Sequence, residues 1–120
     1  MSTIRRGEIY LTNFGKKYNS EFGKIRPALI VQNDIANRNI DLVAFKGVTV
    51  IPLTTQLSGG DIRFLIKKRD SLEHNSEICI NELCTLDQSR IDETKKCTVL
   101  NPKEMEEIEM KLKRHLGMAL

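Results

Sequence analysis

Arg26 is the side chain of this sequence best suited to bind an anion. It follows a polar, glycine-containing segment, residues 21–25 (EFGKI), and precedes Pro27 and the apolar run 28–31 (ALIV). Because a residue before proline favours extended backbone, we expect Arg26 at the start of a strand with its main chain held in place. A guanidinium fixed there is able to bind two phosphate oxygens at once, although a structural ion pair would explain the same pattern.

A second group of polar side chains, Thr54, Thr55 and Gln56, comes directly after the apolar run 48–53 (VTVIPL). Two hydroxyl groups and an amide at the end of a strand are able to hydrogen-bond phosphate oxygens without adding charge. Threonine is also common in strands for reasons of β-propensity, and that explanation is the better one for this segment taken alone.

Basic residues are concentrated in the half of the chain that contains Arg26. Residues 1–60 hold eight Lys and Arg against four Asp and Glu, whereas residues 61–120 hold eleven against twelve. The excess in the first half suits an anionic partner, and a solvated surface with scattered lysines is the alternative. Aromatic residues make up only 5% of the chain and tryptophan is absent, which disfavours an aromatic platform for stacked bases.

The composition is that of one soluble globular domain spanning residues 1–120. The chain is 40% hydrophobic and 29% charged, and its length is enough to bury a sizeable core. Residues 1–6 (MSTIRR) lack the apolar region of a signal peptide, and no apolar run approaches the length of a membrane span. We therefore expect a cytoplasmic protein with no membrane partner.

Cysteine and histidine give little support to metal or cofactor chemistry. Cys79, Cys84 and Cys97 are odd in number and form no C-x-x-C pair, which disfavours both a zinc site and a disulfide framework. We expect these thiols to be buried or half-buried and expect neither a metal nor a cofactor. His74 and His115 fall in a polar linker and on a helix, so we expect both to be exposed and assign them no catalytic role.

Alternating and continuous apolar runs predict a mostly antiparallel β domain of SH3-barrel type with a C-terminal helix. A loop as long as residues 14–25 is usually functional or mobile, and the apolar run 27–32 indicates a central strand. A hairpin turn is expected near Gly59 and Gly60. Strands are expected at 7–13, 27–32, 42–45, 48–54, 62–68, 77–86 and 98–100, with a turn at 33–39.

The C-terminal helix carries the clearest local signals. Asn101 is a good N-cap, Pro102 suits the first helical position, and Glu104 completes a capping box. Gly117 is a natural stop. One apolar stripe, which should pack on the sheet, consists of Met105, Ile108, Leu112 and Leu116.

Four blocks of the sequence occur together in the order that one known family has them. They are RGEIY at 6–10, SEFGKIRP at 20–27 with VQND at 31–34, LTTQ at 53–56 and TLDQSRI at 85–91. With these blocks the chain resembles the MazF/PemK/Kid family of toxin endoribonucleases from bacterial toxin–antitoxin pairs. The resemblance implies a five-stranded SH3-like barrel, a symmetric homodimer, and cleavage of single-stranded RNA at short motifs without a metal.

The same resemblance assigns roles to individual residues. It implies that Arg26 and Thr54 are catalytic and that Glu21, a candidate general base, lies close to the RNA. The 2′-hydroxyl of the RNA would then act as nucleophile, and the products would carry a 2′,3′-cyclic phosphate and a 5′-hydroxyl. The further residues that we expect to contact RNA are Lys16, Lys17, Lys24, Asn33, Thr55 and Gln56.

The expected partner besides RNA is a cognate antitoxin, an acidic and partly disordered segment that blocks the basic loop. Two departures from the family pattern are Cys84, where many relatives have a basic residue, and a longer segment at 40–48. Two other functions fit the same fold: a CcdB-like gyrase poison, which acts through the end of its C-terminal helix, and a noncatalytic RNA-binding barrel. The arginine loop favours the nuclease, because the gyrase poisons lack it.

Overall fold

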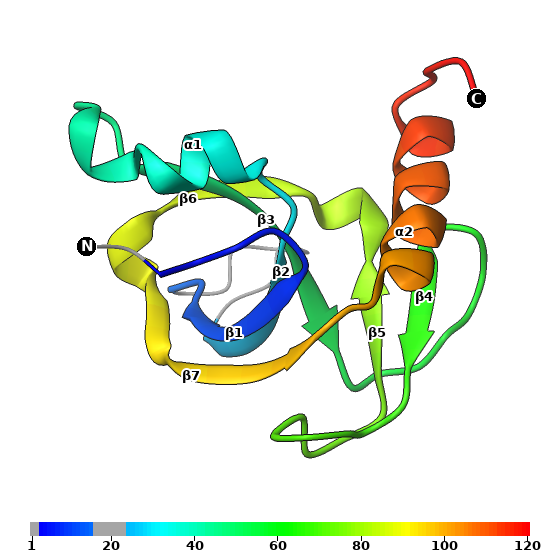
Figure 1. The fold of residues 1–120 in the computed structure, drawn as a ribbon. Coiled ribbons are helices and arrows are strands. Elements are labelled where there is room, and N and C mark those ends of the chain that lie inside the picture. The colour runs from blue at the N-terminus through cyan, green and yellow to red at the C-terminus, as the bar shows by residue number, and fades with distance from the viewer. Residues whose placement is uncertain (1–2, 16–23) are drawn as a thin grey trace.

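A computed structural model describes residues 3–15 and 24–120 of the chain. Seven strands and two α-helices are present in these ranges (Figure 1). The strands are β1 (Glu8–Asn13), β2 (Ile25–Ile30), β3 (Gly47–Thr54), β4 (Arg63–Ile66), β5 (Ser76–Cys79), β6 (Cys84–Asp87) and β7 (Ile91–Val99). The helices are α1 (Asp34–Arg38) and α2 (Pro102–His115), and single 3₁₀ turns occupy Ile40–Leu42, Ile80–Glu82 and Gln88–Arg90.

The strands form one strongly curved antiparallel sheet in the order β4-β5-β3-β2-β1-β7, with β6 also paired to β3. The sheet curls into a barrel that stays open, because the described pairings do not join the outer strands to each other (Figure 1). The predicted fold class, an antiparallel SH3-like sheet with a C-terminal helix, is confirmed. The predicted central position of β2 is also confirmed, because β2 pairs with β1 on one side and with β3 on the other.

The expectation of five strands is wrong for this chain, and the predicted strand 77–86 explains part of the difference. The 3₁₀ turn Ile80–Glu82 divides that segment into β5 and β6. Both pieces pair with β3, which is long enough to accept β6 along Gly47–Val50 and β5 at Leu53 and Thr54. The segment predicted as one strand is therefore two strands, which pair with different parts of β3.

Two apolar clusters lie on opposite faces of the curved sheet. One packs between the sheet and α2 and includes Ile9, Leu29, Ile51, Ile78 and Ile108. The other fills the barrel interior and includes Tyr10, Ala28, Ile30, Val50 and Ile91. Because successive side chains of a strand point to opposite faces, β1, β2 and β3 are buried on both sides and fix the position of every residue they carry.

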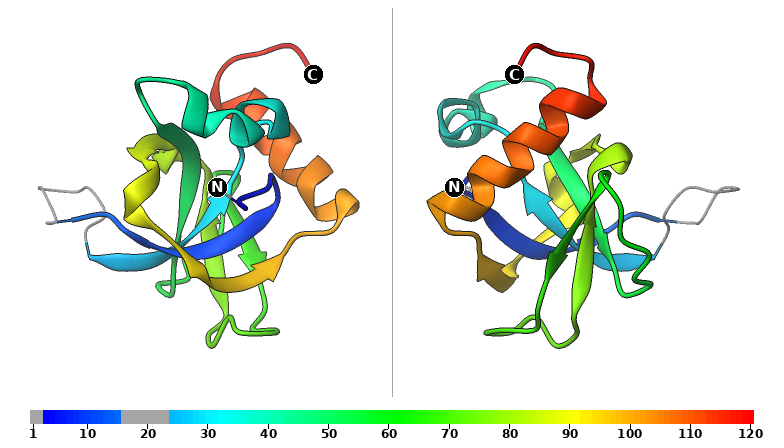
Figure 2. Two further views of the ribbon diagram at one scale, coloured as in Figure 1. Left: turned by 60° about the vertical axis from the view of Figure 1, so that its left-hand side comes forward. Right: turned by 90° about the vertical axis from the view of Figure 1, so that its right-hand side faces the viewer.

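The C-terminal helix follows its predicted signals. Asn101 accepts a hydrogen bond from the Glu104 amide, the Glu104 carboxylate accepts one from the Asn101 amide, and Pro102 occupies the first turn. Figure 2 shows α2 lying against the sheet, where Met105 and Ile108 are buried. Leu116 departs from the predicted stripe, because it lies at the exposed end of the helix.

Three other local predictions are corrected by the structure. Residues 42–45 do not form a strand: they follow a 3₁₀ turn, and Leu42 and Phe45 are exposed. The predicted turn at 33–39 contains α1, which Asn33 caps and the buried Asn37 ties to the carbonyl of Gln32. The last strand is not the short segment 98–100, because β7 runs from Ile91 to Val99 along β1.

The predicted hairpin near Gly59 and Gly60 is the fourth correction. The chain does turn there, but the strands on either side, β3 and β4, are not paired, and β5 lies between them. A buried carboxylate on β5, Glu77, accepts hydrogen bonds from the amides of Ser58 and Gly59. These contacts hold the connection across β5 instead of closing a two-stranded hairpin.

Candidate functional site

Arg26 and Thr54 lie on neighbouring strands at the same level of the sheet. Ala28 of β2 pairs with Pro52 of β3, and Ile30 pairs with Val50. The same register carried two residues beyond Ala28 places Arg26 opposite Thr54. Arg26 and Thr54 both line one pocket of about 200 Å³. The other residues that line it are Lys24, Ile25, Pro27, Leu53, Thr55 and Ser76.

Arg26 has the position that its sequence context predicted. It is the second residue of β2, opposite Thr12 of β1, and its side chain is half-buried. Just before it, Lys24 has a left-handed backbone with φ of 66° and exchanges hydrogen bonds with the main chain at the end of β1. The Lys24 carbonyl accepts from the Phe14 amide and the Lys24 amide donates to the Gly15 carbonyl, so the two ends of the intervening loop are joined.

That loop contains three of the predicted site residues, Lys16, Lys17 and Glu21. They lie outside the described residues, so their roles stay predictions. Lys24 lines the pocket, and its contact with RNA stays a prediction.

Thr54 ends β3 and is only 5% exposed. Its hydroxyl oxygen accepts a hydrogen bond from the Gln56 amide at 3.1 Å, which leaves the hydroxyl proton available for a ligand in the pocket. Thr55 and Gln56 are exposed, and of these two only Thr55 lines the pocket. A buried hydroxyl beside an arginine is an arrangement that binds one phosphate group through both charge and neutral hydrogen bonds.

Asn33 lies apart from this pocket. Its side chain caps α1 by accepting from the Ala36 amide at 2.8 Å, and it does not line the Arg26–Thr54 pocket. Asn33 therefore has a structural role as the cap of α1, and its predicted contact with RNA stays a prediction.

Glu77 is the residue of this region that the sequence did not indicate. It lies opposite Thr54 in the β3–β5 pairing and is 4% exposed. Its carboxylate accepts from the Ser58 and Gly59 amides, each at 2.9 Å, and from Arg63 at 3.0 Å. Burial raises the pKa of Glu77, but the two amides and the Arg63 charge outweigh it, and the pKa is lowered overall. Glu77 anchors the loop after Thr54 because β5 pairs with β3. The sequence alone did not indicate that pairing.

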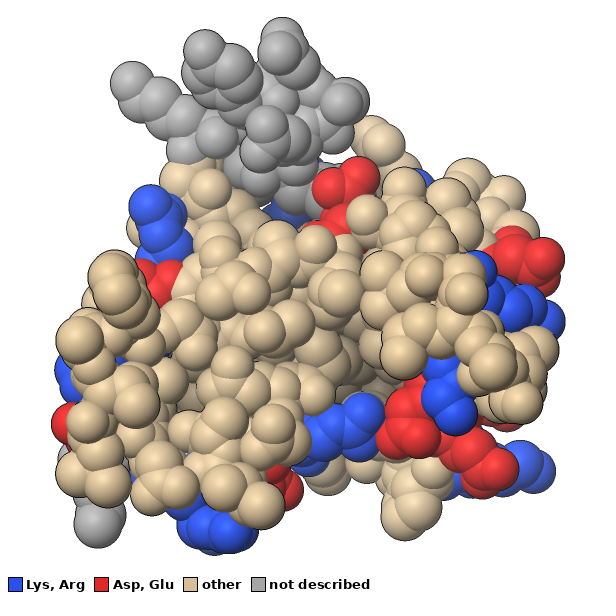
Figure 3. Space-filling view, turned by 90° about the horizontal axis from the view of Figure 1, so that it is seen from above, with Lys and Arg blue, Asp and Glu red and all other residues tan. Residues whose placement is uncertain are grey.

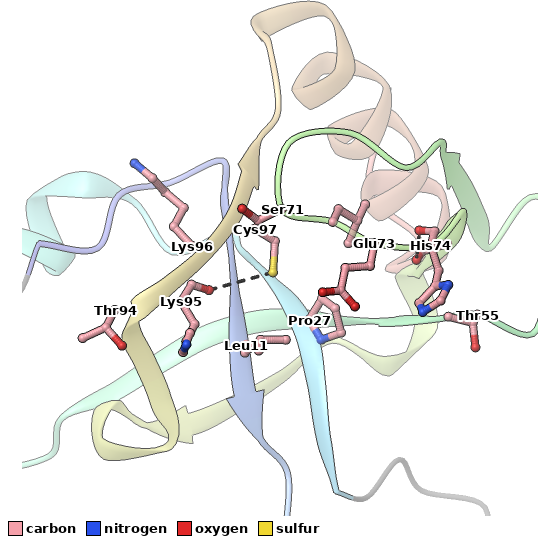
Figure 4. Close-up of a pocket in the computed structure, with 12 residues that line it drawn as sticks. Leu11, Pro27, Thr55, Ser71, Glu73, His74, Thr94, Lys95, Lys96 and Cys97 are labelled. Atoms are coloured by element: carbon pink, nitrogen blue, oxygen red, sulfur yellow. Dashed lines mark hydrogen bonds between the residues drawn. The ribbon is translucent and has the colours of Figure 1, made fainter.

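A larger pocket of about 560 Å³ adjoins the first and shares Pro27, Thr55 and Ser76 with it (Figure 4). It lies between β1, β2, β7 and the turn before β5. His74 lines this pocket and is exposed, as predicted, and His115 is exposed on α2. The two pockets meet at Pro27, Thr55 and Ser76.

The thiols take no part in the Arg26–Thr54 pocket. Cys79 and Cys97 are buried and Cys84 is half-buried, which confirms the prediction for all three. Burial raises the pKa of Cys79 to about 11, so its thiol stays protonated at neutral pH. Among residues 3–15 and 24–120, no group of three or more His, Cys, Asp and Glu side chains is arranged to hold a metal ion.

Comparison with known proteins places this pocket in a family context. The family model of the PemK-like, MazF-like toxins of type II toxin–antitoxin systems matches residues 5–116. The chain belongs to this family. The match confirms the resemblance inferred from the four sequence blocks, and it includes both Arg26 and Thr54.

Solved structures of MazF toxins have the same fold. The Mycobacterium tuberculosis toxin MazF-mt6 has a TM-score of 0.74 at 15% identity, covering 94% of this chain and 99% of that one. A mycobacterial endoribonuclease in complex with its cognate antitoxin has a TM-score of 0.75 at 21% identity, covering 98% and 99%. MazF in a MazE–MazF complex from Deinococcus radiodurans has a TM-score of 0.74 at 20% identity, covering 99% and 100%.

Two departures from the family pattern have clear positions in this MazF-like toxin. Cys84 is the first residue of β6 and pairs with Val50 on the inner part of β3. The segment 40–48 forms the 3₁₀ turn and an exposed loop that leads into β3. Neither segment contributes a residue to the Arg26–Thr54 pocket. In the described part of the chain, no helix is long and apolar enough to cross a membrane.

Proposed function

We propose that this toxin is a metal-independent endoribonuclease that cuts single-stranded RNA at a short sequence motif. The observation that carries the proposal is the shared pocket of Arg26 and Thr54, in a chain of the MazF-like family. Two similar mycobacterial structures are those of endoribonucleases. A half-buried guanidinium next to a buried hydroxyl gives this chain groups suited to a phosphodiester.

The reaction needs no nucleophile from the protein. The 2′-oxygen of the RNA attacks the adjacent phosphorus, and its proton passes to a base, for which Glu21 is the candidate. The bond from phosphorus to the 5′-oxygen breaks, the leaving 5′-oxygen takes a proton from solvent water, and the base returns its proton to solvent. The products carry a 2′,3′-cyclic phosphate and a 5′-hydroxyl.

Arg26 and Thr54 would act on the charge that develops at phosphorus. A guanidinium donates to two non-bridging oxygens in a fixed geometry, and the Thr54 hydroxyl donates a further hydrogen bond. A preorganised donor of this kind lowers a barrier by roughly 3 kcal/mol. Thr54 is already fixed by the Gln56 amide, so little reorganisation is needed when the substrate binds.

We also propose that the toxin acts in the cytoplasm as a homodimer that an acidic antitoxin neutralises. The face seen from above in Figure 3 is largely uncharged across its centre. Exposed apolar side chains occur on the loop after α1 and beyond α2, where a second copy would cover them: Leu42, Val43, Phe45, Leu116, Met118 and Leu120. The antitoxin would lie along the pocket and compete with RNA, in keeping with the MazE–MazF and toxin–antitoxin complexes among similar structures.

The deciding experiment is incubation of purified protein with a long single-stranded RNA in EDTA, with the ends mapped by primer extension. Arg26→Ala and Thr54→Ala are compared with Arg38→Ala, a matched change on the exposed side of α1. We expect discrete cuts from the wild type and Arg38→Ala and none from the other two variants. If the folded wild-type dimer leaves the RNA intact, the nuclease is ruled out, and inhibition of gyrase supercoiling becomes the function to test.

A further inference from the structure

The larger pocket beside Arg26 and Thr54 has an apolar floor and a polar rim. Leu11 of β1, Pro27 of β2 and Cys97 of β7 contribute to the floor. Figure 4 shows Glu73 and His74 on one side of this floor and Lys95 on the other. The volume of about 560 Å³ is within the usual range for pockets that bind small organic groups.

The pocket adjoins the site of the proposed cleavage. Pro27, Thr55 and Ser76 line both pockets, so the two pockets meet at these three residues. A phosphodiester held by Arg26 and Thr54 has a nucleotide on each side of it. One of those nucleotides therefore lies next to this second pocket.

The charges on the rim identify which part of a nucleotide fits. Glu73 is an exposed carboxylate that lies across the floor from Lys95, and Lys96 is paired with Glu8 at 3.1 Å. The described residues of the rim therefore have no excess of positive charge to hold a second phosphate. The Glu73 carboxylate accepts hydrogen bonds from the N–H groups of a base, and Lys95 donates to base carbonyl or ring-nitrogen acceptors. The faces of a base match the apolar floor. No Phe, Tyr or Trp is among the described residues that line the pocket, so recognition would rest mainly on the edges of the base, with the His74 ring at the rim able to stack.

The wall that carries Glu73 and His74 is held rigidly by contacts with β7. The Ser71 amide donates to the Cys97 carbonyl at 2.9 Å, and the Thr98 hydroxyl donates to the Asp70 carboxylate at 2.6 Å. On the other side of the turn, the Lys68 amide donates to the Asn75 side chain at 2.9 Å. A preformed wall lowers the entropic cost of binding and discriminates between bases more sharply than a mobile one.

We propose that this pocket, bounded by Glu73, His74 and Lys95, holds the base of a nucleotide next to the scissile phosphate and determines part of the cleavage motif. The proposal rests on the proposed RNA cleavage and adds to it the residues that read sequence. It treats Glu73 and Lys95 as specificity residues, which touch the base but not the reacting phosphate.

The test is to map cleavage ends on a long RNA of mixed sequence for the wild type, Glu73→Gln and Lys95→Met. Glu107→Gln and Lys113→Met, on the exposed side of α2, are matched controls. We expect both pocket variants to keep cutting, but with changed base frequencies at one position beside the cut. We also expect kcat/KM on the wild-type motif to fall about tenfold, the usual effect of losing one contact that discriminates between substrates. The controls should keep the wild-type frequencies.

Different failures separate this inference from the function on which it rests. If the wild type cuts RNA and the pocket variants cut at the same motif with unchanged base frequencies, the base pocket is wrong and the nuclease stands. If the pocket variants keep the wild-type motif but bind the antitoxin more weakly, the pocket holds a side chain of the antitoxin. The proposal that the pocket holds a base is then also wrong. If a folded wild type cuts no RNA, the nuclease itself is wrong.

Discussion

Thr54 and Glu77 lie directly opposite each other in the antiparallel pairing of β3 and β5. Thr54 faces the candidate site, whereas Glu77 anchors the chain that leaves it by accepting from the Ser58 and Gly59 amides. The Thr54 hydroxyl in turn accepts from the Gln56 amide. The polar segment after β3 is therefore fixed at both ends, and its fixed position depends on a carboxylate that comes later in the sequence.

Glu77→Gln should lower the free energy of unfolding by about 1–3 kcal/mol at pH 7, because a buried ionic acceptor of three hydrogen bonds is lost. The pKa of Glu77 is lowered from its usual 4.5 in the folded state, so the carboxylate stabilises the fold fully above about pH 4.5. That contribution disappears as the pH falls through the lower folded pKa. Urea unfolding between pH 7 and pH 3 should show the difference from wild type narrowing in acid.

Glu107→Gln is the control for this experiment, because it removes an exposed carboxylate from α2. It should leave stability close to wild type over the same pH range. A difference between Glu77→Gln and wild type that stays constant down to pH 3 would contradict the ionic role of Glu77.

Arg26→Lys should lower the rate of RNA cleavage by about a hundredfold, although it keeps the positive charge. The ammonium group does not reproduce the two-pronged contact of a guanidinium with phosphate oxygens. Single-turnover cleavage of the mapped motif measures the effect, with Arg38→Lys as the matched control. Near wild-type cleavage by Arg26→Lys would show that charge alone suffices at this position.

Thr54→Val should lower the rate of RNA cleavage roughly tenfold to a hundredfold, whereas Thr54→Ser should keep most of the rate. Valine keeps the shape of the buried side chain but removes the hydroxyl that accepts from the Gln56 amide. Serine keeps the hydroxyl. Cleavage rates, with melting temperatures measured in parallel, separate lost chemistry from lost stability. Equal activity of the two variants would argue that the hydroxyl takes no part.

Arg69→Lys should destabilise the docking of α2 on the sheet. Arg69 donates to both carboxylate oxygens of Glu104, at 2.8 and 2.9 Å, and to the Val99 carbonyl at 2.9 Å. Because the pair is partly exposed, we expect a loss of about 1 kcal/mol, or a melting temperature lower by about 4 °C. Differential scanning calorimetry measures it. A melting temperature equal to that of the wild type would contradict this role of Arg69.

The sequence by itself was sufficient where the cause of the structure is local. Proline after Arg26 restricts the backbone of that arginine, and Arg26 does lie at the start of a strand, as the second residue of β2. The helix signals at Asn101, Pro102 and Glu104 are contacts between near neighbours, and all of them form. The family resemblance was visible for a related reason, because its motifs are short and contiguous.

Only the tertiary structure decided which strands are neighbours and which residues surround the site. Separate parts of β3 pair with β5 and β6, although β4 follows β3 in the chain, and this order makes Glu77 the anchor of the loop after Thr54. Residues 42–45 are apolar yet stay exposed, and none of the strands in residues 3–15 and 24–120 pairs with them. The pocket of Glu73 and Lys95 likewise joins segments far apart in sequence. Strand pairing is decided by packing the whole core at once, so no local pattern contains that information.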